Sequence, residues 1–259
     1  MKKDTQMKAP WYWTSLIVGL LSAWLFIDHI TGFKFPHYFY NSNPGITSYS
    51  GINVVSAWAD LSYFTYHTII FFSVWAICLF IAYAFKLKRL NLFLTHEATV
   101  SFILTNYTLT CLLYTVFEVA DGKIDFGLYA LTNHGIHNFG TNVLAHYVFY
   151  AFAVAICLKL KAHGKAKARH LAVIAGYLLI YYLAVKITGK YCYVIEWYPY
   201  PIFDAKMLCD MLTLPSNNPG AAACLLGLAL FLILAFYIFI YYGIISLKRK
   251  IIAKNKSSD

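Results

Sequence analysis

Residues 221–247 read AAACLLGLALFLILAFYIFIYYGIISL, an apolar stretch without a single charged side chain. A helix needs about 20 such residues to cross the hydrocarbon core of a bilayer, so this stretch predicts a membrane-spanning helix. Together with five earlier runs of similar character it makes six candidate spans: Trp11–Ile30, Leu61–Phe85, Ala98–Phe117, Thr141–Leu158, Leu171–Ile187 and Ala221–Leu247. We therefore predict an all-α protein, a six-helix integral membrane bundle.

The composition of the whole chain agrees with this prediction. The 259 residues are 60% hydrophobic and only 12% charged, about half the roughly 25% charge of a soluble domain. These values exclude a soluble domain, a disordered chain and a small disulfide scaffold. Because no long linker or repeat divides the chain, we predict a single membrane domain over residues 1–259, with short tails at 1–10 and 248–259.

The positive charges predict the orientation of the bundle. Cytoplasmic connections keep Lys and Arg, whereas exported ones are depleted of them. Sixteen cations lie in the tails or follow the second and fourth runs, and five lie on the other side: Lys34, Lys123, Lys186, Lys190 and Lys206. We expect both termini to be cytoplasmic, and we attribute the net charge of +10 to topology rather than to nucleic-acid binding.

Two polar side chains within the runs are candidate catalytic residues. Thr65 and His146 each lie one to two turns from the predicted exported end of a run. At about 1.5 Å rise per residue their depths are similar, so the two helices can bring them together. A threonine hydroxyl beside an imidazole is suited to nucleophilic acyl transfer. The structural alternatives are a threonine bonded to its own helix and a histidine that bridges two helices.

Asn142 and His67 are secondary candidates near this pair. Asn142 precedes His146 by four residues, so it lies on the same helix face and is placed to orient the imidazole or to stabilise an oxyanion. An interhelical amide hydrogen bond is the alternative. His67 is two residues from Thr65 and points away from it on an ideal helix.

The exported connections contain further polar groups. His134 and His137, with Asp121 and Asp125 nearby, have the residue types of a zinc site, but a solvated loop is the competing interpretation. Cys192 and Cys209 share one connection and are candidates for a disulfide. The segment 196–204, EWYPYPIFD, has alternating prolines that favour extended backbone, so we expect it either to cover a lipid-binding cleft or to anchor at the interface.

Three motifs resemble those of the bacterial Pr6Pr membrane proteins. They are the Trp-Tyr-Pro-Tyr-Pro-x-x-Asp segment before the last run, Tyr63-Phe64-Thr65, and Asn142-Val143-Leu144-Ala145-His146-Tyr147. That family resembles the eukaryotic androgen-induced membrane hydrolases, which cleave fatty acid esters of hydroxy fatty acids with a threonine and a histidine. The resemblance implies the same roles for Thr65 and His146. Ile69 and Val143 stand where these patterns carry polar residues.

These observations predict an intramembrane lipid-ester hydrolase of the plasma membrane. Thr65 attacks, His146 acts as base, Asn142 assists, and no cofactor is required. The predicted partner is a membrane lipid or acyl ester, and the residues expected to line the substrate are Trp197, Tyr198, Tyr200 and Asp204. The alternative is a non-enzymatic transporter or lipid-binding protein that uses His146, Glu118, Asp121 and Glu196.

Overall fold

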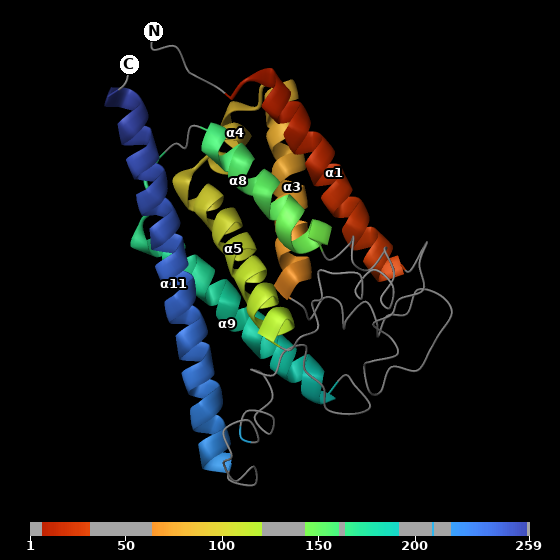
Figure 1. Ribbon diagram of the computed structural model, residues 1–259, viewed down its shortest axis with the longest axis vertical. Coiled ribbons are helices and arrows are strands. Elements are labelled where there is room, and N and C mark those ends of the chain that lie inside the picture. Colours follow the sequence, from red (N-terminus) through yellow and green to blue (C-terminus); the bar gives the residue numbers. More distant parts are fainter. Residues whose placement is uncertain are drawn as a thin grey trace. The chain divides into compact units, whose positions relative to one another are not determined.

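The computed structural model describes residues 7–31, 64–120, 143–160, 164–191, 209 and 219–257. Every element in these ranges is a helix (Figure 1). The elements are α1 (Ala9–Thr31), α3 (Phe64–Ala84), α4 (Lys88–Leu94), α5 (Glu97–Ala120), the π-helical turn η2 (Leu144–Val148), α8 (Phe149–Lys159), α9 (Ala168–Tyr191) and α11 (Pro219–Ser257). The predicted all-α class is confirmed.

Four of these helices are long and apolar enough to cross a membrane. They cover Ala9–Ile27, Phe64–Ala84, Ala168–Thr188 and Gly220–Ile251, each overlapping a predicted run. The chain is therefore a membrane-embedded helical protein. The predicted fourth run corresponds to a shorter apolar helix, Leu144–Lys159. The count of six spans stays a prediction.

The predicted third run, Ala98–Phe117, lies within α5, which carries many polar side chains and is not among the four candidate spans. Several of these are fully buried, including Ser101, Thr105 and Asn106. Thr105 Oγ1 donates to the Ser101 carbonyl at 2.7 Å, and Asn106 Nδ2 donates to the Phe102 carbonyl at 2.8 Å. A helix surrounded by other helices tolerates such residues, because their hydrogen bonds are made without lipid contact.

The chain divides into two compact units. One comprises Met1–Phe26, His67–Lys167 and Ile240–Asp259, and the other comprises Ile27–Tyr66 and Ala168–Phe239. Helices α1, α3 and α11 each contribute to both units. The first unit contains most of α1 and α3, all of α4, α5, η2 and α8, and the charged end of α11.

In the first unit, α1 packs closely against α3. Ser73 Oγ donates to Ser22 Oγ at 2.8 Å, and the rings of Tyr12 and Tyr83 stack with centroids 4.2 Å apart. A methyl group added to Gly19 would lie 3.0 Å from Ile77 Cγ1, so the glycine permits this close approach. Small residues and interhelical hydrogen bonds are the usual basis of helix association in membranes, where lipid removes the hydrophobic driving force.

In the second unit, α9 has one buried face and one exposed apolar face. The buried side chains are Ile174, Leu178, Tyr181 and Val185, and Phe64 of α3 contacts the Tyr181 ring edge-on at 5.5 Å. On the other face, Ile180 is 68% exposed. Exposed aliphatic side chains in a helix of this length are suited to contact with lipid.

The segment 248–257, predicted as a tail, continues α11 to Ser257. Lysine and arginine have good helix propensity, so the run of cations does not end the helix. Lys248 is buried and Arg249 is bonded to another helix, so the first residues of this segment are part of the packed first unit.

Candidate functional site

His146 lies at the centre of the π-helical turn η2, inside the first unit. Its side chain is only 6% exposed. The backbone N–H of Phe149 bonds the carbonyl of Leu144, five residues back, which widens the helix at this point. Such π-helical turns are rare in α-helices and occur often at functional sites.

Tyr114 of α5 fixes the orientation of the His146 ring. The two rings are stacked, with centroids 3.6 Å apart and planes 15° from parallel. A buried imidazole held in one orientation is suited to accept or donate a proton in a defined direction. The sequence prediction singled out His146 but not Tyr114, because α5 and η2 are far apart in the chain and no local pattern joins them.

Two hydrogen bonds between hydroxyls hold the helix of His146 against α5. Thr115 Oγ1 and Tyr147 Oη lie 2.9 Å apart, and Thr108 Oγ1 donates to Tyr150 Oη at 3.2 Å. Tyr147 follows His146 within η2, and Tyr150 lies in the first turn of α8. The bonds therefore set the position of η2 along α5, and with it the depth of the imidazole.

Thr65 is the second residue of α3 and is half-buried. It belongs to the second unit, next to Phe64 and its contact with Tyr181, whereas His146 belongs to the first unit. The pairing of the Thr65 hydroxyl with the His146 imidazole stays a prediction. His67, the secondary candidate, contacts the Phe71 ring edge-on, with centroids 6.3 Å apart.

Most other predicted site residues lie outside the described residues. These are Asn142, the substrate-lining set Trp197, Tyr198, Tyr200 and Asp204, and the loop residues Asp121, Asp125, His134 and His137. Of the two cysteines considered for a disulfide, Cys209 is a buried free cysteine and Cys192 lies outside the described residues.

The first unit also contains buried hydroxyl contacts that the sequence prediction missed. Thr68 Oγ1 of α3 and Thr110 Oγ1 of α5 lie 2.9 Å apart, and both side chains are buried. Thr68 is one turn beyond Thr65 on α3. A pattern of hydroxyl residues on α5 was present in the sequence, but only a structure shows which of them meets a partner on another helix.

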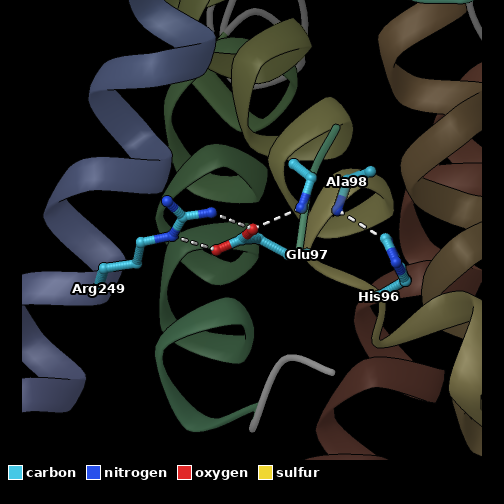
Figure 2. Close-up of polar contacts among 5 residues, drawn as sticks. His96, Glu97, Ala98 and Arg249 are labelled. Carbon is cyan, nitrogen blue, oxygen red and sulfur yellow. Dashed lines mark hydrogen bonds and ion pairs between the residues drawn. The ribbon is translucent and has the colours of Figure 1, made fainter. Parts of the chain in front are cut away.

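A second polar cluster surrounds Glu97, the first residue of α5 (Figure 2). Arg249 of α11 donates to both carboxylate oxygens, from Nε to Oε1 at 2.9 Å and from Nη2 to Oε2 at 2.7 Å. The backbone N–H of Ala166 donates to Oε2 at 2.6 Å. The carboxylate thus joins the start of α5, the end of α11 and the connection before α9.

The environment of Glu97 favours its ionised form. Burial alone would raise the pKa of this carboxyl, but the hydrogen bonds from Arg249 and Ala166 and the charges of Arg249 and Lys248 outweigh burial and lower the pKa. The Lys248 ammonium is buried and has no hydrogen-bond partner among the described residues. Glu97 therefore also supplies the negative charge beside a buried cation.

His96 caps the same helix end. Its Nδ1 accepts the backbone N–H of Ala98 at 3.1 Å, which satisfies one of the donors left open at a helix start (Figure 2). Gly164 lies against the imidazole, with a positive φ of 67° that glycine adopts without strain. A sequence signal for this cluster did exist: Glu97 is an isolated acid beside connections that otherwise carry cations.

No protein-family model, curated protein or solved structure matches the chain. Its likeness to the Pr6Pr proteins and the membrane hydrolases stays a prediction from the three sequence motifs.

Proposed function

We propose that the chain is an intramembrane lipid-ester hydrolase in which Thr65 is the nucleophile and His146 the general base. The observation that carries this proposal is the setting of His146, buried in a π-helical turn and stacked on Tyr114. An ionisable side chain within a membrane helix is costly and is a functional candidate by default.

The proposed topology has six spans in the plasma membrane, both termini in the cytoplasm and a pocket that opens to the exported side. The excess of cations in alternate connections supports it. The proposed substrate is an acyl ester of a membrane lipid, with Trp197, Tyr198, Tyr200 and Asp204 along the acyl chain. Membership of the Pr6Pr family is part of the same proposal and is supported by the quoted motifs.

The proposed reaction has two stages. Thr65 Oγ attacks the ester carbonyl carbon while His146 takes the hydroxyl proton, and collapse of the tetrahedral intermediate expels the alcohol, which receives that proton. Water then attacks the acyl-threonine, again giving its proton to His146, and the threonine oxygen leaves with the proton. Asn142 orients the imidazole or donates to the oxyanion.

A fluorophosphonate probe tests this mechanism on the purified, detergent-solubilised chain, because it reacts only with activated hydroxyl nucleophiles. We expect the wild type and Thr65→Ser to be labelled, Thr65→Ala to lose labelling, and His146→Ala to be labelled much more slowly. Thr14→Ala is the matched control, because the Thr14 hydroxyl bonds the Pro10 carbonyl of its own helix. Its labelling should equal that of the wild type.

Labelling that persists in Thr65→Ala would contradict the assignment of the nucleophile. An unlabelled, well-folded wild type would favour the non-enzymatic transporter or lipid-binding function. Elution profiles in size-exclusion chromatography identify variants that have not folded, so that loss of labelling is not confused with loss of structure.

A further inference from the structure

The charged end of α11 carries a groove on its exposed side. The groove has a volume of about 510 Å³ and is lined by Tyr242, Ile245, Ser246, Arg249 and Lys250. These positions recur every three or four residues, so they share one face of the helix over two turns. Apart from Ile245, each of these side chains ends in a hydrogen-bonding group, and two of them are cationic.

Arg249 is held in a fixed orientation at this groove. Glu97 engages two of its five N–H donors through the paired bonds from Nε and Nη2. The other three donate to no other described residue, and the side chain is 51% exposed. The carboxylate therefore orients a planar guanidinium and leaves donors available, an arrangement suited to binding anionic oxygens in pairs.

The charges around the groove favour an anion. Lys250 is exposed beside Arg249, and the buried ammonium of Lys248 adds positive charge behind them. The Glu97 carboxylate accepts from Arg249 with both oxygens. A guanidinium, an ammonium and the Ser246 and Tyr242 hydroxyls together match the oxygen atoms of a phosphate.

The groove lies at the end of the candidate span Gly220–Ile251, which indicates the kind of phosphate it takes. Leu247, on the adjoining helix face, is 60% exposed, so apolar surface continues beside the polar groups. Cationic pockets at the ends of membrane helices are suited to lipid headgroups. We propose that this groove binds the phosphodiester headgroup of an anionic phospholipid. The site is independent of the proposed hydrolase activity.

Lipid binding to the full-length protein in detergent tests the proposal. Native mass spectrometry would count bound lipids during titration with short-chain phosphatidylglycerol, phosphatidylcholine or inorganic phosphate. We expect phosphatidylglycerol to bind at least tenfold more tightly than phosphatidylcholine. Replacing two of the exposed donors, in Ser246→Ala with Lys250→Gln, should weaken phosphatidylglycerol binding at least tenfold, because two bonds to a charged oxygen are lost.

Lys88→Gln is the matched control, since it removes an exposed cation from the start of α4 and leaves α11 unchanged. Its binding should stay within twofold of the wild type. Equal binding of the two lipids, or equal weakening in the control and the double variant, would overturn the proposal. Competition by inorganic phosphate at the same concentration as the lipid would overturn the assignment to a lipid.

Discussion

Removing Arg249, which is ion-paired with Glu97, should destabilise the first unit more than removing the exposed Arg89 of α4. The Glu97 side chain is only 7% exposed, and in Arg249→Met its carboxylate keeps the Ala166 N–H as a donor but loses both bonds from the guanidinium. Breaking a fully buried ion pair costs about 3 to 5 kcal/mol, and an exposed pair contributes about 0 to 1 kcal/mol. Because the arginine is half-exposed, water screens the interaction, and we expect a loss of about 2 to 3 kcal/mol.

Unfolding by SDS in mixed micelles, followed by circular dichroism, measures this loss. The matched control is Arg89→Met, which removes an exposed arginine of α4 and should change stability by less than about 0.5 kcal/mol. The double variant with Glu97→Gln should recover part of the loss, since no uncompensated carboxylate remains. A loss in Arg249→Met no greater than in Arg89→Met would refute the stabilising role of the pair.

Two further predictions concern the same cluster. The pKa of Glu97 is lowered in the folded protein, so its ionised carboxylate stabilises the fold fully above the ordinary carboxyl pKa of about 4.3. This stabilisation is lost as pH falls through the lower pKa of the folded state. The difference in unfolding free energy between wild type and Arg249→Met should therefore shrink in acid, and a difference that grows would contradict this. Gly164→Ala should lower the free energy of unfolding by about 2 kcal/mol in the same assay, because alanine is strained at positive φ and its methyl group would lie 2.5 Å from His96 Nε2. Gly243→Ala is the control, because no atom lies within 4 Å of the added methyl group. This variant should be at least as stable as the wild type.

The helices themselves were predictable because each run carries its own signal. The predicted run Leu171–Ile187 lies within α9, and Ala221–Leu247 lies within α11. Hydropathy depends on composition over about 20 residues, so it locates a helix without knowledge of its neighbours. The signal is weaker for α5, which is not among the four candidate spans and buries several polar side chains, two of which donate to carbonyls of their own helix.

The contacts of the candidate site were less predictable because they join distant segments. Glu97 and Arg249 are 152 residues apart, and Tyr114 meets His146 across two helices. Sequence spacing identifies residues on one helix face, but the partner helix depends on packing that no local pattern encodes. Thr65 and His146 were paired by their similar depth and by the motif resemblance, and neither determines which helices adjoin.

Glu97 combines three roles that the sequence gives no reason to connect. Its charge lies at the N-terminus of α5, where the helix dipole favours an anion. Its carboxylate oxygens accept hydrogen bonds from Arg249 of α11. One of them also accepts the backbone N–H of Ala166, in the connection before α9. A change at Glu97 therefore perturbs a helix start, a helix end and a connection together. A change at Arg249 leaves the helix dipole and the Ala166 bond in place. The energy of the ion pair is therefore obtained from the double-mutant cycle, in which the effects that do not involve Arg249 cancel.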